Sequence, residues 1–243
     1  MRSRGTQKLA KQIYTFYLQF SFFFEQTYII IIPIKRCHKR LYIQMKKISK
    51  SQRFIYIKFF KPYGVLCTFT DPDKRLNLSN FIQVPGVYTA GRLDMDSEGL
   101  LLLTNNGDIN HRITSPKFHL TKTYLVLVEG NLDNDHINLL SSGPIIKGGY
   151  KTKACKVEQI SDPILPERVK SVTPHGPTSW IVMRLNEGKK RQIRHMTAAV
   201  GLPTLRLVRV AIGPIQISNL NPGEWKYLEE GELSQLRREL KIS

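Results

Sequence analysis

Residues 90–107, with the sequence AGRLDMDSEGLLLLTNNG, place a charged loop directly before a strongly apolar segment. Four consecutive leucines form the centre of that segment and are typical of a buried strand. Asn105, Asn106 and Gly107 then favour a turn. The acidic residues Asp94 and Asp96 are therefore expected on a loop at the edge of a rigid element, where catalytic side chains are often held.

Apolar patterning predicts strands and helices on both sides of this stretch. Strands are expected at residues 54–60, 65–70, 100–104, 124–128 and 180–185. Helices are expected at residues 78–82, with Asn77 as the cap, and at 134–140, 189–200 and 232–240. These elements interleave without a regular strand–helix–strand period, so the prediction is an α+β fold with a mixed, mostly antiparallel central sheet.

The composition predicts a globular protein with an anionic partner. The 243 residues include 37 Lys and Arg against 19 Asp and Glu, which gives a formal net charge of +18. This charge excludes an acidic solvating protein and favours RNA, DNA or an anionic membrane as the partner. Cys37, Cys67 and Cys155 are scattered without a C-x-x-C pair, so we expect no disulfide framework and a reducing, cytoplasmic location.

Residues 1–44 differ in composition from the rest of the chain. Residues 13–34 are largely apolar and aromatic, but Gln19, Glu25 and Gln26 interrupt them. Three interpretations stay open, namely sequence translated upstream of a start at Met45, a membrane anchor, and an ordinary N-terminal element. We expect an extension at 1–44, a functional domain at 45–243 and no stable membrane association. The extension carries eight basic residues and one acidic residue, so the domain keeps +11 of the net charge.

The acidic loop by itself allows three kinds of site. Asp94, Asp96 and Gly99 fit a calcium loop, but Asn105 stands where a bidentate glutamate is needed. A pair of carboxylates could hydrolyse a glycosidic bond, but the basic charge would then be unexplained. An ion pair between Asp94 and Arg92 would be structural only. The histidines show no metal-binding spacing, so no metal site is expected.

Three motifs in a fixed order decide between these kinds of site. Residues 91–107 (GRLDMDSEGLLLLTNNG) are followed by residues 122–124 (KTY) and then by residues 186–196 (NEGKKRQIRHM). Together they resemble the RNA pseudouridine synthases, specifically the family of small-subunit and B/E/F-type ribosomal enzymes. Within that family, residues 69–71 (FTD) and 86–88 (GVY) are most similar to the E-type enzymes of the large subunit.

The resemblance implies two subdomains with flanking helices and an active-site cleft. It implies an isomerase that converts a uridine, in large-subunit ribosomal RNA, to pseudouridine. The reaction breaks the N1–C1′ bond and rejoins uracil through C5, so no cofactor is expected. The family's usual N-terminal S4 RNA-binding domain is not visible, as in the E type, and we expect a monomer. The alternative is a catalytically silent ribosome-assembly protein that binds ribosomal RNA on the same scaffold.

The resemblance assigns three catalytic residues, Asp94, Tyr124 and Arg194. Asp94 matches the catalytic aspartate, and attack at C1′, elimination to a glycal-like intermediate and the older proposal of attack at C6 all stay open. Arg194 matches the arginine that pairs with this aspartate and lowers its pKa. Tyr124 matches the active-site tyrosine, whose ring stacks on uracil and whose hydroxyl could serve in removal of the C5 proton.

Further residues are expected to bind the RNA. Arg92 is expected to contact a flanking phosphate or to fill the space that the flipped nucleotide leaves. The basic residues at 189–191 are expected to contact phosphates, and Ile193 is expected to pack under the target uracil. The complete predicted RNA-binding set is Arg92, Lys122, Lys189, Lys190, Arg191, Gln192 and Ile193.

Overall fold

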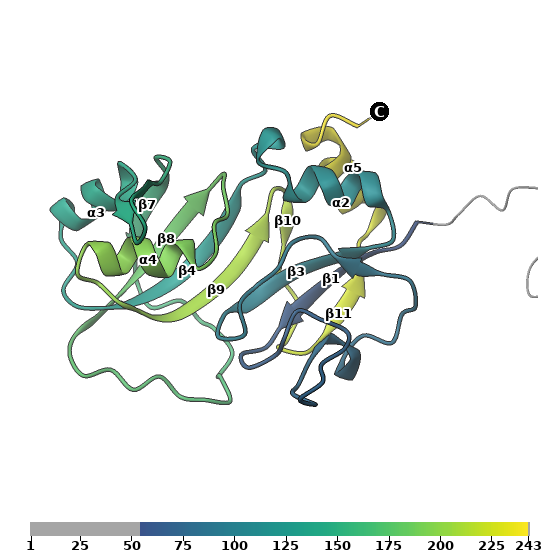
Figure 1. Cartoon of the computed structure of the whole chain (residues 1–243), viewed down its shortest axis with the longest axis horizontal. Helices are drawn as coiled ribbons and strands as arrows, with labels where there is room; N and C mark the ends of the chain where they lie inside the picture. The colour runs from purple at the N-terminus through teal and green to yellow at the C-terminus, as the bar shows by residue number, and fades with distance from the viewer. Residues whose placement is uncertain (1–53, 243) are drawn as a thin grey trace, which may run out of the picture. The chain divides into compact units, whose positions relative to one another are not determined.

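The computed structural model describes residues 54–242 (Figure 1). The expectations for residues 1–44 fall outside this part of the chain. Within residues 54–242, no helix is both long enough and apolar enough to cross a membrane.

The described residues form strands, α-helices and two short 3₁₀ helices. The strands are β1 (Tyr56–Lys61), β2 (Tyr88–Thr89), β3 (Glu98–Thr104), β4 (Lys122–Glu129), β5 (Ile145–Ile146), β6 (Tyr150–Lys151), β7 (Lys156–Ile160), β8 (Thr178–Leu185), β9 (Thr204–Ile212), β10 (Ile215–Gln216) and β11 (Trp225–Tyr227). The helices are α2 (Gly107–Thr114), α3 (Asn134–Ser141), α4 (Gln192–Ala199) and α5 (Glu230–Glu239), with the 3₁₀ helices η1 (Leu78–Asn80) and η2 (Pro116–Phe118).

One sheet runs through the whole described part of the chain, in the order β11-β1-β3-β9-β4-β8-β7. Its neighbouring strands are antiparallel except β3 and β9, which run parallel and pair only at Glu98–Val208 and Gly99–Arg209. At Gly99, with φ of 106°, any side chain would overlap the backbone of Arg209. The prediction of an α+β fold with a mixed, mostly antiparallel sheet is confirmed.

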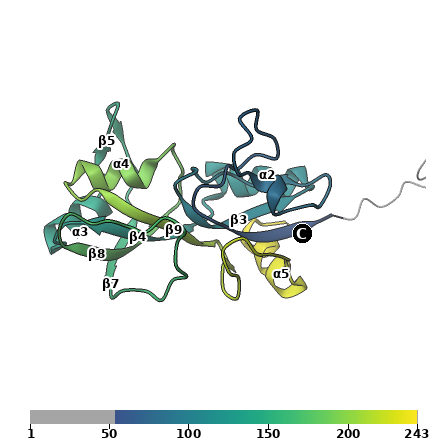
Figure 2. The same ribbon diagram turned by 90° about the horizontal axis from the view of Figure 1, so that it is seen from below.

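Figure 2 shows α3 and α4 in one half of the sheet and α2 and α5 in the other, with β9 between them, and hydrophobic cores form in both halves. In one half of the sheet, β4 and β8 pack against α3 and α4. In the other half, alternate residues of β3 serve two cores, because successive side chains of a strand point to opposite faces. Leu100 and Leu102 pack with α2 and α5, and Leu101 and Leu103 pack with the segment around η1. The predicted subdomains are thus two halves of one continuous sheet.

The structure contains most of the predicted elements, but the prediction of a strand at residues 65–70 is wrong. This segment makes only an isolated bridge between Leu66 and Asn77, and part of it lines a cavity. Asn77 does cap the predicted short helix, η1, by accepting a hydrogen bond from the N–H of Ser79 at 2.9 Å. The segment is apolar because it covers the sheet, and not because it extends it.

Two helix boundaries also differ from the prediction. Asn106 does not end β3 in a simple turn, because its side chain accepts hydrogen bonds from the N–H groups of Asp108 and Ile109 and begins α2, which the sequence did not predict. The helix predicted at 189–200 begins only at Gln192, since Arg191 before it has the left-handed φ of 52°. The long strand β9 was not predicted either.

Candidate active site

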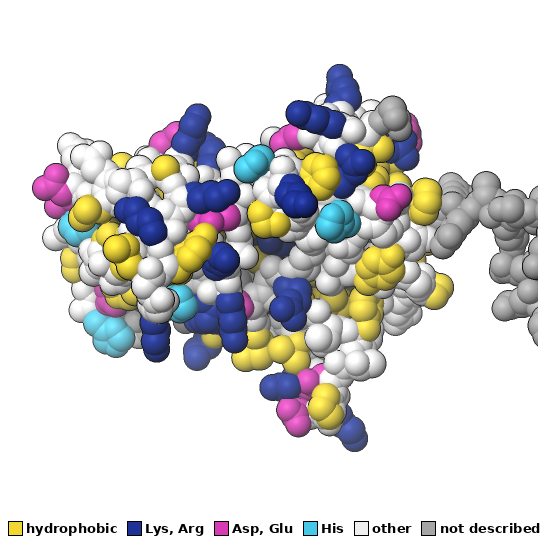
Figure 3. Space-filling view, turned by 45° about the horizontal axis from the view of Figure 1, so that its top comes forward, with side chains coloured by type: hydrophobic (Ala, Val, Ile, Leu, Met, Phe, Trp, Pro, Cys, Tyr) yellow, Lys and Arg dark blue, Asp and Glu magenta, His cyan; other side chains and the backbone are white. Residues whose placement is uncertain are grey.

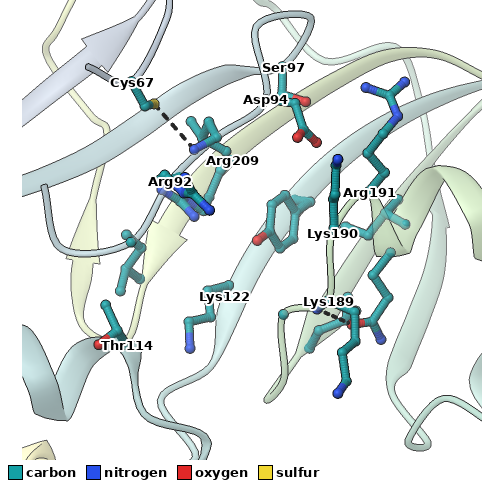
Figure 4. Close-up of a pocket in the computed structure, with 18 of the residues that line it drawn as sticks. Cys67, Arg92, Asp94, Ser97, Thr114, Lys122, Lys189, Lys190, Arg191 and Arg209 are labelled. Carbon is teal, nitrogen blue, oxygen red and sulfur yellow. Dashed lines mark hydrogen bonds between the residues drawn. The ribbon is translucent and has the colours of Figure 1, made fainter. Parts of the chain in front are cut away.

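A cavity of about 600 Å³ opens where the two halves of the sheet meet (Figure 4). This volume is within the roughly 300–1,000 Å³ of pockets that take small molecules. The residues that line it include nine of the ten predicted site residues, namely Arg92, Asp94, Lys122, Tyr124, Lys189, Lys190, Arg191, Gln192 and Ile193. The tenth, Arg194, lies in a smaller pocket that Asp96 also lines.

The loop that carries Asp94 is held on both sides of this residue. The N–H of Leu93 donates a hydrogen bond to Cys67 Sγ at 3.3 Å, and the N–H of Gly64 donates to the carbonyl of Met95 at 2.8 Å. Gly91 turns the chain into the loop with a φ of 86°, which side-chain-bearing residues rarely adopt. The half-buried Asp94 side chain therefore reaches the cavity from a backbone that is anchored at both neighbouring residues.

A buried lysine that the sequence did not predict lies at this loop. Lys61, at the end of β1, is fully buried, and its ammonium group donates to the carbonyls of Pro62 at 2.8 Å and Met95 at 3.4 Å. Burial lowers the pKa of Lys61 to about 8, although nearby negative charges, including those of Asp94 and Asp96, act in the opposite direction. The lysine keeps its proton at neutral pH and offsets the repulsion between these two carboxylates.

One wall of the cavity comes from β4 and β9. Tyr124 and Lys122 are two residues apart on β4 and therefore point to the same side of the sheet. Tyr124 pairs with Arg209 of β9, which also lines the cavity. Burial, together with the positive charge of Arg209, lowers the pKa of Lys122 to about 8. Arg209 was not predicted, and the one sequence signal for it is a basic residue within the apolar run of residues 207–212 (LVRVAI).

The opposite wall is the segment 186–193, which leads into α4. The buried carboxylate of Glu187 accepts hydrogen bonds from Tyr150 Oη at 2.9 Å, from the N–H of Lys153 at 2.9 Å and from the side chain of Gln192. Burial alone would raise the pKa of Glu187, but these hydrogen bonds hold it below its usual value. Gln192 also accepts from the N–H of Lys189 at 2.9 Å. This network fixes the segment that presents the basic residues 189–191 to the cavity.

The predicted pairing of Arg194 with Asp94 is wrong, because Arg194 is bound to Asp96. Its Nε lies 3.4 Å from the Asp96 carboxylate, and its Nη2 donates to the Asp96 carbonyl at 2.8 Å. Within residues 54–242, no Lys, Arg or His nitrogen lies within 4 Å of the Asp94 carboxylate. The motif spacing does not distinguish two carboxylates that are two residues apart, since their positions relative to α4 depend on tertiary packing.

Asp96 joins the loop of one half of the sheet to the other half. Arg191 donates two hydrogen bonds to its carboxylate, at 3.0 and 2.9 Å. Burial alone would raise the pKa of Asp96, but Arg191 and Arg194 outweigh this effect and hold it below its usual value. The left-handed backbone of Arg191 costs roughly 1–2 kcal/mol in a residue other than glycine. The bidentate bond to Asp96 offsets this strain and keeps the start of α4 in place.

The charge of the lining suits an anionic ligand. Basic side chains gather around the hollow between the two halves (Figure 3). Six basic side chains line the cavity, those of Arg92, Lys122, Lys189, Lys190, Arg191 and Arg209, against the acidic side chains of Asp94 and Glu187. In the part of the chain that the structure describes, no group of three His, Cys, Asp or Glu side chains is placed to hold a metal ion.

Comparison with known proteins identifies relatives of the whole described domain. Residues 55–199 match the family described as RNA pseudouridylate synthase. Proteins named ribosomal large subunit pseudouridine synthase E are 46% identical to this chain in Vibrio vulnificus, over 183 residues, and in Xanthomonas campestris, over 177 residues. The matches cover 74% of this chain and 77% of the Vibrio protein, and 68% of this chain and 91% of the Xanthomonas protein.

A solved structure shares the fold. The crystal structure of a pseudouridylate synthase superposes with a TM-score of 0.65 at 29% identity, covering 78% of this chain and 76% of that chain. The resemblance seen in the three sequence motifs is thereby confirmed, and the chain belongs to the RNA pseudouridylate synthase family.

Proposed function

We propose that this chain converts a uridine of large-subunit ribosomal RNA to pseudouridine. The observation that carries the proposal is one cavity in which Asp94 and Tyr124 lie among six basic side chains. The names of the Vibrio and Xanthomonas relatives support the large subunit as the source of the substrate. The net charge of +18 supports a polyanionic partner. Because substrate and product are isomers, the balanced reaction requires no co-substrate.

Asp94 is the group that acts on the sugar in this proposal. Its carboxylate either attacks C1′ as the N1–C1′ bond breaks or removes a proton from C2′ to give a glycal. The freed uracil turns and C5 forms the new bond to C1′, while the bond from C1′ to Asp94 breaks or, in the glycal route, C2′ regains its proton from Asp94. C5 then loses its proton and N1 gains one. Both routes need an ionised carboxylate in a fixed position, and the anchors at Leu93 and Met95 support that requirement.

Tyr124 and Ile193 hold the flipped base. Both side chains line the cavity, and stacking of an aromatic ring on a base is worth about 1–3 kcal/mol. Arg92 is exposed at the cavity and is free to contact the RNA beside the flipped nucleotide. Its position supports a role in extruding the target base.

The remaining basic residues divide into two groups. Lys189 and Lys190 are exposed on the 186–193 wall and contact phosphates, which position the RNA without specifying its sequence. Arg191 and Arg194 both bind Asp96, so they act on Asp94 through the loop that the two acidic residues share. They are positioning residues in this proposal.

Mapping pseudouridines tests the substrate. In cells that lack the gene, we expect one pseudouridine of large-subunit ribosomal RNA to be missing, and we expect the plasmid-borne chain to restore it. The purified chain should form the same pseudouridine in a large-subunit transcript and leave a small-subunit transcript unmodified. If no large-subunit site is lost, or if the lost site lies in another RNA, the proposal is wrong. An assembly defect with an unchanged pseudouridine pattern would favour the silent ribosome-assembly protein.

RNA binding should weaken as the pH rises from 7 to 9. Lys122 carries its proton below a pKa of about 8 and loses it above, so its charge is available to the RNA only on the acidic side of that value. We expect the affinity for a large-subunit transcript to fall by up to about tenfold, the equivalent of roughly 1.4 kcal/mol for one charge-assisted contact.

The variant Lys122→Met separates this effect from other titrations. It should bind the RNA more weakly than the parent at pH 7, and its affinity should change less between pH 7 and 9. Lys61 has a similar pKa and is retained in this variant, so a smaller change assigns the pH dependence to Lys122. Filter-binding measurements at constant ionic strength provide the comparison. An equal decrease in the parent and the variant would assign the pH dependence to another group.

A further inference from the structure

Arg209 is a buried basic residue whose hydrogen bonding is incomplete. It lies on β9 with 5% of its surface exposed, and its Nε donates to the carbonyl of Leu100 at 2.8 Å. Its Nη2 has no hydrogen-bond partner within residues 54–242. A guanidinium without a charge partner is costly to bury, so its presence beside the cavity calls for an explanation.

Arg206, three residues earlier on the same strand, is a buried arginine whose charge is paired within the protein. It donates to both oxygens of Glu98 at 3.0 and 2.9 Å and to the carbonyl of Pro166 at 2.8 Å. Arg209 has no such carboxylate, since within residues 54–242 none lies within 4 Å of its guanidinium. The difference indicates that the missing partner of Arg209 comes from the ligand of the cavity.

The position of Arg209 indicates which part of the ligand it meets. Arg209 pairs directly with Tyr124, so the two side chains leave neighbouring strands at the same level of the sheet. Figure 4 shows Arg209 and Arg92 together on one side of Asp94, and Arg191 on the other side. Phosphates suit the exposed Lys189 and Lys190, whereas a buried donor beside the stacking tyrosine suits the base itself.

We propose that Arg209 stabilises the negative charge that uracil acquires when its glycosidic bond breaks, through a hydrogen bond from its guanidinium group to a carbonyl oxygen of the base. This inference rests on the proposed function. When the N1–C1′ bond breaks, its electron pair stays with uracil, and the charge spreads over N1, O2 and O4. C1′ meanwhile bonds to Asp94 or, in the glycal route, the sugar loses the C2′ proton to it. When C5 bonds to C1′, the bond to Asp94 breaks and the negative charge returns to its carboxylate, or, in the glycal route, Asp94 returns the proton to C2′. C5 then gives up its proton and N1 gains one.

A fixed cation is effective at this place because its surroundings exclude water. Donors that are oriented before the reaction act most strongly in a buried, low-dielectric site, and removing one donor typically lowers a rate about 10²–10³-fold. The guanidinium of Arg209 is oriented in this way by its bond to the carbonyl of Leu100, and the backbone of Arg209 packs closely against Gly99. Arg209 is therefore a catalytic residue in this proposal.

Three substitutions at this position separate charge from structure. We expect the single-turnover rate of tritium release from C5 of [5-³H]uridine-labelled large-subunit RNA to fall about 100-fold in Arg209→Met. Arg209→Lys keeps the charge and Arg209→Gln keeps only neutral donors, so the expected order of rates is parent, Lys, Gln, Met. The Kd for the RNA should change less than about threefold, because the phosphate contacts remain. Arg238→Met, on the exposed face of α5, removes the same charge outside the cavity and should match the parent.

The outcomes separate the two proposals. Equal rates for the Lys and Gln variants, an unchanged rate in Arg209→Met, or a loss confined to Kd would overturn the role of Arg209. Melting temperatures of all variants identify any that unfold, and the comparison of Lys with Gln still decides if the Met variant does so. If the parent releases no tritium from any large-subunit RNA, the proposed function fails, and the role of Arg209 fails with it.

Discussion

The Asp94→Asn variant is expected to lose pseudouridine formation almost completely. Asparagine is nearly the same size as aspartate, so the loop anchors at Leu93 and Met95 should remain intact. The amide can neither attack C1′ nor accept a proton from C2′. Loss of a nucleophile typically lowers the rate about 10⁴-fold or more. The measurement is single-turnover tritium release from C5 of labelled large-subunit RNA.

Two further variants make this result specific. Asp135→Asn removes a carboxylate from α3, outside the cavity, and should match the parent. Asp96→Asn weakens the link to Arg191 and Arg194 and should reduce the rate by a smaller factor, because Asp94 itself is retained. RNA binding by Asp94→Asn should be preserved, since the six basic side chains are unchanged. If Asp94→Asn modifies RNA as fast as the parent, the proposed chemistry is wrong.

The Glu98→Gln variant is expected to lose about 3–5 kcal/mol of folding free energy, which is typical when one partner of a buried ion pair is removed. Glu98 is 2% exposed, and its two oxygens accept both hydrogen bonds from Arg206. Glutamine leaves the arginine charge buried without a counter-charge. For a domain of this size the melting temperature should fall by roughly 6–20 °C.

The Glu158→Gln variant is the matched control for Glu98→Gln. Glu158 pairs with Arg184 at 3.0 Å, but its side chain is 57% exposed. Pairs of this kind contribute about 0–1 kcal/mol, so the melting temperature should barely change. The double variant Glu98→Leu with Arg206→Leu leaves no buried charge and should recover much of the loss. Equal losses of folding free energy in Glu98→Gln and Glu158→Gln, measured by urea unfolding, would show that the buried pair contributes no more to stability than the exposed pair.

The predictions from sequence succeeded where a residue's role depends on local pattern. Strands β1, β3, β4 and β8 and the helices α3 and α5 follow from the sequence pattern, with their ends shifted by at most two residues. The motifs correctly grouped Asp94 and Tyr124 in one cavity, although they are 30 residues apart in sequence, because motifs report on side chains that act together.

The failures involve contacts between segments that are distant in sequence. Whether Arg194 meets Asp94 or Asp96 depends on how the 90–97 loop lies against α4, which no pattern in either segment records. The segment at 65–70 has strand-like composition but finds no extended partner strand. Arg209 stands in an apolar run, and only the structure shows that no carboxylate within residues 54–242 pairs with it.

The junction at Gly99 has a consequence for how this enzyme could change. Within residues 54–242, the strands β3 and β9, which join the two halves of the sheet, pair at only two residue pairs, and Arg209 of the cavity belongs to one of them. Arg209 therefore belongs both to the strand pairing that joins the two halves of the sheet and to the lining of the cavity. Laboratory selection for a new RNA target has little freedom there and would act first on the rim, where the side chains of Lys189 and Lys190 are exposed and take no part in the strand pairing.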